Sequence, residues 1–264
     1  MELKGRAVLL TGATGGIGRP TALLLAREGA RIGLVARREE PLRVLAAEVE
    51  RAGGEAFVAP ADLRRAEDCR RAVAETVERF RGLDALVNNA GVSILKEVDE
   101  ATDADIEEMV ELNLLSVIRV TRAALPALAA RPGSAIVNVS SFAGRVAAPR
   151  YSFYNATKFG VSGLTEGWRR ELFARGIRVT LLLPAAVETP LLDHAGRDRA
   201  LGIGPAGVVL RPEAVAAAIV RALRRHPAEV YMPFWNRWLA WLNVIAPRLS
   251  DRIVTALFRY PGRG

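Results

Sequence analysis

Short apolar segments alternate with longer segments of helical periodicity along most of the chain. The apolar segments cover residues 6–11, 31–36, 55–60, 83–88, 134–140, 178–183 and 228–232. Such continuous apolar runs are typical of parallel strands that are buried on both faces. The longest helical patterns cover residues 102–130 and 152–175. The alternation predicts an α/β fold, in which a doubly wound, seven-stranded parallel sheet carries helices on both faces.

The same pattern predicts the domain organisation. Residues 1–233 contain no repeat, low-complexity tract or linker, so we expect one domain with a core large enough to need no disulfide. Residues 234–264 follow the last expected strand and form an amphipathic extension.

A glycine-rich turn follows the first expected strand. Residues 11–18 read Thr-Gly-Ala-Thr-Gly-Gly-Ile-Gly, and a helical stretch begins directly after them. Such a turn lets phosphate groups approach backbone N–H groups at the positive end of the helix dipole. The spacing differs from the commoner Gly-x-Gly-x-x-Gly fingerprint and lacks the Gly-Lys-Ser/Thr ending of nucleoside-triphosphate loops. The alternative is a structural turn whose glycines only allow close packing of strand and helix.

A tyrosine and a lysine are four residues apart in the second long helical stretch. Tyr154 and Lys158 share one helix face, with their Cβ atoms roughly 6 Å apart. We expect the ammonium to favour the phenolate and to lower the phenol's pKa from its usual value of about 10, which suits general acid–base catalysis. Arginine supplies all but three of the 37 basic residues, so a lysine here suggests a need for a compact ammonium. Such pairs also occur by chance on solvated helices.

With Ser141, thirteen residues before Tyr154, these motifs resemble the short-chain dehydrogenase/reductase family in its single-domain form. The resemblance runs from Gly5 to about Pro233, and the motifs occur in the family's order. It implies a Rossmann-type fold and an NAD(P)-dependent oxidoreductase that transfers a hydride between nicotinamide and a carbonyl or alcohol.

The resemblance also implies a role for each site residue. Tyr154 would exchange the proton, Lys158 would lower the pKa of the phenol and hold the nicotinamide ribose, and Ser141 would bind the substrate oxygen. Asn113 would complete the catalytic tetrad and hold a water that feeds protons toward Lys158. Cofactor contacts would come from the glycine turn, the ends of the second, third, fourth and sixth strands, the tyrosine and the lysine. These positions are Gly12, Thr14, Gly15, Gly16, Ile17, Gly18, Arg37, Asp62, Leu63, Asn88, Ala90, Gly91, Tyr154, Lys158, Pro184, Val187 and Thr189. Ala185 departs from the family, which usually has glycine there.

The end of the second expected strand favours NADP(H) over NAD(H). Enzymes that prefer NAD usually place an acidic residue there, which accepts hydrogen bonds from the ribose 2′-hydroxyl. Here Ala36 takes that position, and Arg37 can pair with a 2′-phosphate through charge-assisted bonds. The alternative is that Arg37 simply begins a basic loop.

Charge and composition narrow the function classes. The net charge is +8, but the arginines are interleaved with acidic residues on many helices, which argues against nucleic-acid binding. Two histidines far apart argue against a metal site, and one cysteine excludes an internal disulfide. The lack of a basic-then-apolar leader favours the cytoplasm.

The substrate and partners are less defined. We expect a small, lipophilic ketone or alcohol, because the residues expected near the pocket are apolar: Val92, Ile94, Phe142, Val146, Ala186, Leu191 and Leu192. Arg145 and Arg150 could bind an acidic group, although surface positions are favoured for both. We expect a homodimer or homotetramer.

The amphipathic extension has three interpretations. Its apolar residues recur at helical spacing, with arginines between them: Phe234, Trp235, Trp238, Trp241, Leu242, Ile245, Leu249, Ile253, Leu257 and Phe258. Neither half has the uninterrupted apolar length of a membrane span. The segment can pack as a lid over the pocket or against a second subunit, and we favour these over the third interpretation, contact with a membrane surface.

Two other functions compete with a reductase. One is a dinucleotide-binding sensor or scaffold without turnover, which the presence of Tyr154 and Lys158 disfavours. The other is an epimerase or dehydratase on the same fold. Such enzymes usually carry a larger carboxyl-terminal domain than the thirty or so residues present here.

Overall fold

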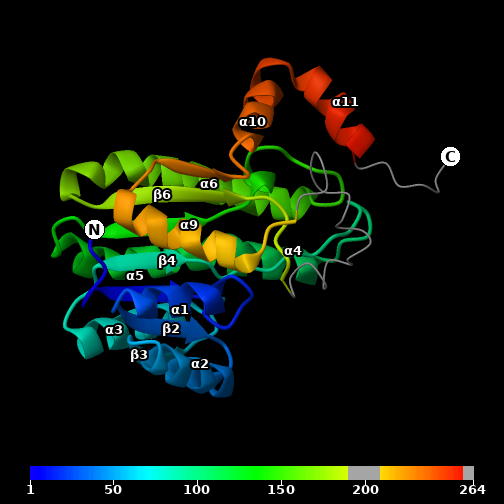
Figure 1. Cartoon of the computed structure of the whole chain (residues 1–264). Coiled ribbons are helices and arrows are strands. Elements are labelled where there is room, and N and C mark those ends of the chain that lie inside the picture. Colours follow the sequence, from blue (N-terminus) through cyan, green and yellow to red (C-terminus); the bar gives the residue numbers. More distant parts are fainter. Residues whose placement is uncertain (190–208, 258–264) are drawn as a thin grey trace.

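A computed structural model of the chain describes residues 1–189 and 209–257. Its centre is a seven-stranded, all-parallel sheet in the order β3-β2-β1-β4-β5-β6-β7 (Figure 1). The strands are β1 (Ala7–Thr11), β2 (Arg31–Ala36), β3 (Glu55–Pro60), β4 (Ala85–Asn88), β5 (Ala135–Val139), β6 (Arg178–Pro184) and β7 (Glu229–Met232). The fold predicted from the sequence is confirmed, with strand ends that differ by one or two residues.

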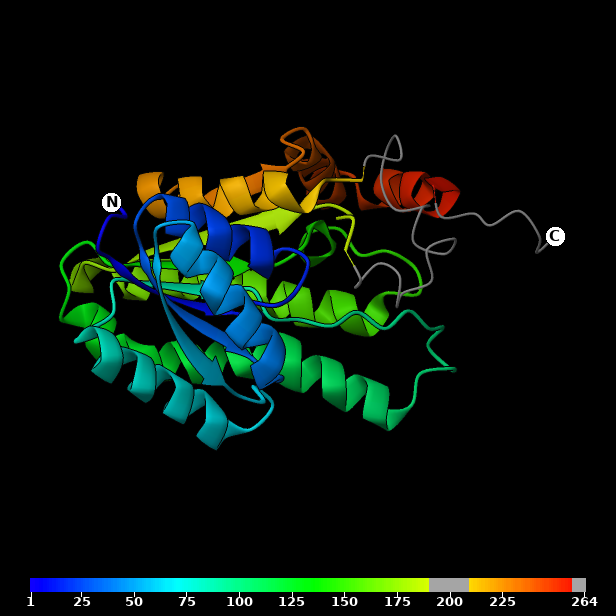
Figure 2. The same ribbon diagram turned by 60° about the horizontal axis from the view of Figure 1, so that its bottom comes forward.

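Helices cover both faces of the sheet (Figure 2). On one face, α1 (Gly18–Arg27), α2 (Glu39–Arg51) and α9 (Pro212–Arg225) bury Leu25, Leu45 and Ile219 against the strands. On the other, α3 (Ala66–Phe80), α5 (Ser116–Ala129) and α6 (Ser152–Glu171) bury side chains such as Val73 and Leu128. The strands contribute apolar side chains to both layers, which explains why they lack polar alternation.

The long helix expected at residues 102–130 is interrupted. It consists of α4 (Asp103–Val110), a π-helical turn η1 (Glu111–Leu115) and α5. By length and composition alone, Asp103–Ala129 is the one described helix that could cross a membrane. Its α5 part, however, packs in the protein core, where Val120 and Ala124 are buried.

The amphipathic extension forms two helices after β7, α10 (Asn236–Ile245) and α11 (Pro247–Leu257), which project from the body of the molecule (Figure 1). Ala240 and Val254 are buried against Val146, which follows the short helix η2 (Phe142–Gly144). Ser250 Oγ donates to Asn243 Oδ1 at 2.9 Å and so joins the two helices. The described part of the extension therefore packs on its own chain.

Candidate active site

The glycine-rich turn lies between β1 and α1 and is shaped by close backbone contacts. Gly12 has a φ of +64°, and a Cβ atom there would lie 2.8 Å from Cα of Ala90. A Cβ atom on Gly18 would lie 2.0 Å from the carbonyl oxygen of Gly12. Packing alone therefore requires glycine at these two positions. The turn also leads into the N-terminus of α1, the end of a helix that attracts phosphate.

A hydroxyl and an amide join the glycine turn to the segment after β4. Thr11 Oγ1 accepts from the backbone N–H groups of Asn89 and Ala90 at 2.9 and 3.1 Å. Asn89 Nδ2 donates to the carbonyl oxygens of Thr11 and Gly12 at 3.1 and 3.2 Å. Asn89 also lines the cavity that contains Tyr154, although it was not among the individual residues expected to contact the cofactor. Its place next to the expected Asn88 was the available signal.

Asn88 itself points into the protein interior. Its Nδ2 donates to Asn138 Oδ1 at 2.8 Å and to Thr121 Oγ1 at 3.0 Å, and the residue is buried. The side-chain amide is thus engaged inside the protein, and contact of Asn88 with the cofactor stays a prediction. The amide instead stabilises the flank of the sheet, since buried polar groups need such partners.

Asn113 lies in the π-helical turn η1 and is fully buried. Its Oδ1 accepts from Val92 N at 2.8 Å, and its Nδ2 donates to Val92 O at 2.8 Å and Thr157 Oγ1 at 3.2 Å. A Cβ atom on Gly91 would lie 3.1 Å from Asn113 Oδ1 and 3.5 Å from Lys158 Nζ. The side chain of Asn113 thus holds the post-β4 segment beside Lys158.

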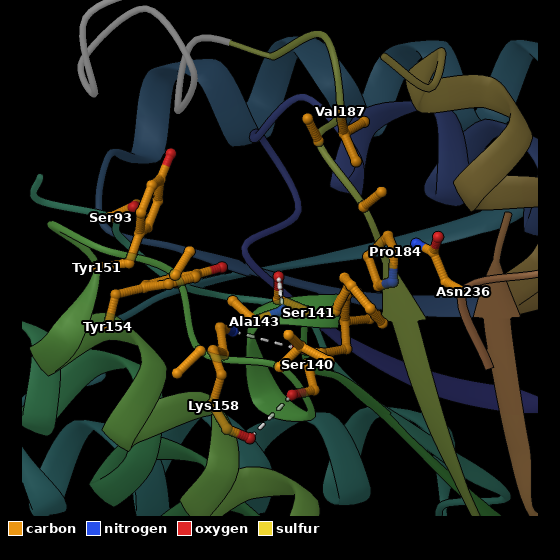
Figure 3. A pocket seen from close by; sticks show the side chains of 18 of the residues that line it. Ser93, Ser140, Ser141, Ala143, Tyr151, Tyr154, Lys158, Pro184, Val187 and Asn236 are labelled. Carbon is orange, nitrogen blue, oxygen red and sulfur yellow. Dashed lines mark hydrogen bonds between the residues drawn. The ribbon is translucent and has the colours of Figure 1, made fainter. Parts of the chain in front are cut away.

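Ser141, Tyr154 and Lys158 line one cavity at the carboxyl ends of β4, β5 and β6 (Figure 3). Lys158 Nζ lies 5.6 Å from the centre of the Tyr154 ring and donates to Val139 O at 3.2 Å. Ser141 precedes η2, and its Oγ accepts from Ala143 N at 3.1 Å. The neighbouring Ser140 instead donates its hydroxyl to the carbonyl oxygen of Lys158. This geometry favours Ser141 over Ser140 as the reactive serine.

Burial governs the protonation of Tyr154 and Lys158. Removal from water raises the pKa of Tyr154 to about 12, and a hydrogen bond with Ser141 opposes the rise. Burial also lowers the pKa of Lys158 to about 8. The pKa of the phenol therefore lies above its usual value and not below it as expected, because desolvation disfavours the charged form of the tyrosine.

The walls of the cavity are mainly apolar. Of the residues expected there, Val92, Phe142, Val146 and Ala186 line it, and Ile94 instead packs with the buried Tyr151 and Tyr154. Leu191 and Leu192 lie outside the described residues. The helices α10 and α11 form part of the wall, to which they contribute Asn236, Leu239, Val254 and Leu257.

The lid interpretation of the extension is thus supported for its inner face. Arg145 and Arg150 are absent from the cavity wall. They pair with Glu229 at 2.5 Å and Glu97 at 2.7 Å.

The residues expected at the adenosine end lie after β2 and β3. Arg37 is exposed directly after β2, and Leu63 is buried. The carboxylate of Asp62 is held by Arg64, with Nη2 and Oδ2 2.6 Å apart, and this bond lowers the pKa of Asp62. Asp62 is thus fixed in its ionised form at the end of the sheet.

The geometry agrees with comparison to known proteins. The family model described as "short chain dehydrogenase" matches residues 6–200. The chain is a short-chain dehydrogenase/reductase. Members of this family are NAD(P)-dependent oxidoreductases of CH–OH and C=O groups, and so is this protein.

Several members of the short-chain dehydrogenase/reductase family are similar to this chain. An 11-beta-hydroxysteroid dehydrogenase A from Sesamum indicum is 34% identical over 97% of this chain and 76% of its own length. The 3-oxoacyl-acyl-carrier-protein reductase FabG of Thermotoga maritima is 34% identical over 83% of this chain and 91% of its own length. A short chain dehydrogenase from Burkholderia cenocepacia, whose crystal structure is in complex with NADP, is 30% identical in sequence. The two structures match over 88% of this chain and 97% of the other, with a TM-score of 0.78.

The described part of this short-chain dehydrogenase/reductase offers few groups for metal-dependent or thiol-based chemistry. Among residues 1–189 and 209–257, no group of three or more His, Cys, Asp or Glu side chains could hold a metal ion. Cys69 is buried, and its pKa rises to about 11, so its thiol is poorly reactive. His226 lies at the end of α9, and His194 lies outside the described residues.

Proposed function

We propose that this enzyme is an NADPH-preferring reductase of lipophilic ketones, with Tyr154 as its general acid. The observation that carries the proposal is the common cavity of Ser141, Tyr154 and Lys158, which has apolar walls and includes Ile17 of the glycine turn. A hydroxyl, a phenol and an ammonium suffice to bind a carbonyl oxygen and to protonate it.

The protein groups have clear tasks in this reaction. NADPH, when bound, supplies the hydride that reduces the carbonyl carbon. Tyr154 is protonated at neutral pH and can donate its phenolic proton to the oxygen as the alcohol forms. The Ser141 hydroxyl can donate a hydrogen bond to the same oxygen and stabilise its developing charge. Lys158, with a pKa of about 8, is mainly charged at neutral pH and stabilises the phenolate that remains.

The proposed cofactor site follows the carboxyl edge of the sheet. The phosphates would lie on the glycine turn, from Gly12 to Gly18, with the adenosine near Asp62 and Leu63. Ala90 and Gly91 would border the middle, and Pro184, Val187 and Thr189 the nicotinamide end. Asn113 would position Lys158, and its role in holding a water stays a prediction.

The preference for NADPH rests on the end of β2. Ala36 leaves no carboxylate there, and the guanidinium of Arg37 is exposed. A 2′-phosphate is the group that this guanidinium would bind best. The neighbour from Burkholderia cenocepacia, which is in complex with NADP, supports the same choice.

A lipophilic substrate is supported by the apolar cavity wall. The names of two relatives point the same way, because a hydroxysteroid and a 3-oxoacyl chain are both largely apolar. The proposed substrate is therefore an apolar ketone, and a homodimer or homotetramer in the cytoplasm stays our expectation for the assembly.

For the outer face of α10 and α11 we propose contact with a membrane surface. This outer face consists of Phe234, Trp235, Trp238, Trp241, Val244, Ile245 and Leu249, all exposed. Tryptophan side chains favour the interface between lipid and water, and Arg237, Arg248 and Arg252 on the same segment complement anionic headgroups. The sequence interpretation favoured protein contacts for the extension, and the inner face makes them within this chain.

Replacing Tyr154 by Phe tests the proposed chemistry. We expect turnover of ketones with NADPH to fall by about 10²–10⁴-fold, because the proton donor is lost while the ring remains. NADPH affinity, measured by quenching of tryptophan fluorescence, should change little. Tyr231→Phe is a matched control, because its phenol lies on β7 and outside the cavity wall.

The other functions predict different results. A sensor or scaffold would bind NADPH, show no turnover of any ketone or alcohol, and be unaffected by Tyr154→Phe. An epimerase or dehydratase would convert its substrate without a net change in nicotinamide absorbance. Failure to bind either dinucleotide would overturn the assignment of the glycine turn.

A further inference from the structure

The cavity contains polar groups that the proposed reaction leaves unused. Ser93 Oγ and Asn236 Oδ1 are buried side-chain atoms that have no hydrogen-bond partner within the described structure, and both residues line the cavity. In Figure 3 they lie at opposite margins of the cavity, with Tyr154 and Ser141 between them. Leaving such groups unpaired costs free energy of folding.

Asn236 has no structural task that explains it. Only 2% of the residue is exposed, yet its Oδ1 atom has no hydrogen-bond partner among the described residues. Asn236 is the first residue of α10, and no side chain makes a capping hydrogen bond at this end of the helix. The backbone N–H of Asn236 donates to Pro233 O. The other cavity residues of the same two helices, Leu239, Val254 and Leu257, are apolar.

We propose that Asn236 selects substrates that carry a second oxygen function, a hydroxyl group remote from the reacting carbonyl. This inference rests on the proposed function and names its substrate class: apolar hydroxy-ketones. A hydroxyl can donate to Oδ1 and accept from Nδ2, so it satisfies the carboxamide in either orientation. A ketone without that hydroxyl leaves the amide unpaired, and sites built for a hydrogen bond discriminate against such analogues.

Asn236→Leu tests the inference with a side chain of similar shape. The substrates are 2-decalone and a series of its hydroxy derivatives, with the hydroxyl at increasing distance from the carbonyl. For at least one hydroxyl position, we expect the wild type to prefer the hydroxy-ketone over 2-decalone by roughly tenfold in kcat/KM. In Asn236→Leu that ratio should fall to about one, while turnover of 2-decalone is kept or rises. Leu239→Met, which changes an apolar wall residue of the same helix, should keep the wild-type ratio.

Thermal unfolding supplies a second measurement that is independent of turnover. If Asn236 serves only the ligand, its replacement by Leu removes a buried carbonyl oxygen that has no partner among the described residues, and the melting temperature should rise by about 2–4 °C. A fall in melting temperature would show that the amide stabilises the fold and would overturn the inference. So would an unchanged substrate ratio. If the wild type reduces no ketone at all with NADPH, the proposed function fails instead.

Discussion

At the scale of single residues, burial governs the chemistry of the site. Lys158 is 5% exposed and lies near a phenol, not a carboxylate. Its charge is therefore costly in the folded state, but with a pKa of about 8 the ammonium still predominates at neutral pH and can stabilise the phenolate. A residue held for function in this way should lower the stability of the protein.

Because the charge of Lys158 is buried, the difference in stability between the wild type and a variant without this lysine should depend on pH. Its pKa is about 8 when folded and 10.5 ordinarily, so the unfolded chain binds more protons between these values. The free energy of unfolding of the wild type should therefore increase as pH rises from 8 toward 10.5, because Lys158 loses its proton first in the folded protein. Lys158→Met should be more stable than the wild type at pH 7 by up to about 3 kcal/mol, and the difference should shrink at pH 9.5.

Urea unfolding at the two pH values measures this difference. Lys96→Met is the matched control, because Lys96 pairs with Asp105 at 2.6 Å and the pKa of Asp105 is only about 2. Its effect on stability should be the same at pH 7 and 9.5. An equally constant effect of Lys158→Met would mean that Lys158 is not desolvated in the folded protein.

The proposed contact of Arg37 with the 2′-phosphate predicts that this residue discriminates NADPH from NADH. Arg37→Ser should weaken NADPH binding by about tenfold or more, because a charge-assisted bond to the 2′-phosphate is lost. NADH affinity should hardly change. Fluorescence titrations of both nucleotides measure the ratio, and Arg70→Ser, at an exposed arginine on α3, controls for the general loss of positive charge. Equal losses in the two variants would remove Arg37 as the determinant.

At the scale of elements, α10 and α11 face two environments. Their inner face contributes to the cavity wall, while on the outer face Trp238 and Trp241 are 61% and 60% exposed. An element that meets both the substrate cavity and a lipid surface would let apolar ketones pass from lipid to enzyme over a short path.

The membrane proposal predicts binding to anionic lipid vesicles. In sedimentation with phosphatidylglycerol–phosphatidylcholine vesicles, the wild type should partition more strongly than onto phosphatidylcholine alone. Replacing Trp238 and Trp241 by Ser should lower the partition coefficient by about tenfold or more. Phe173→Ser, which removes an aromatic residue that is 62% exposed elsewhere, is the matched control.

Two outcomes would contradict a membrane role for the outer face. One is equal partitioning of the wild type and the double tryptophan variant. The other is a dimer in solution that the double variant fails to form, which would show that a second copy of the chain covers this surface.

At the scale of the whole molecule, the sheet and the order of its motifs were predictable from sequence. Apolar periodicity depends on local sequence, and parallel topology follows from the alternation of strands and helices. The π-helical turn at Asn113 was not predictable, because Glu111–Leu115 has the same apolar pattern as the helices around it. The inward direction of Asn88 depends on Thr121 and Asn138, which are distant in sequence.

The chemistry of the site was predictable in part. The Tyr154–Lys158 spacing located the pair, but the direction of the tyrosine pKa depends on burial that only the folded chain creates. The wall formed by α10 and α11 was foreseen as one of three possibilities. The contribution of Asn236 was not foreseen, because no motif marks a residue whose role comes from lacking a partner.

The position of α10 and α11 in the chain has a consequence for biosynthesis. The ribosome delivers the glycine turn first, the tyrosine and lysine midway, and Asn236 through Leu257 only after β7. Synthesis proceeds from the N-terminus at about 5–20 residues per second. The residues of the proposed cofactor site are therefore all made before the two helices that complete the described cavity wall. Under the proposed function, the part of the wall that would select the substrate is added to a chain that already contains its dinucleotide-binding residues.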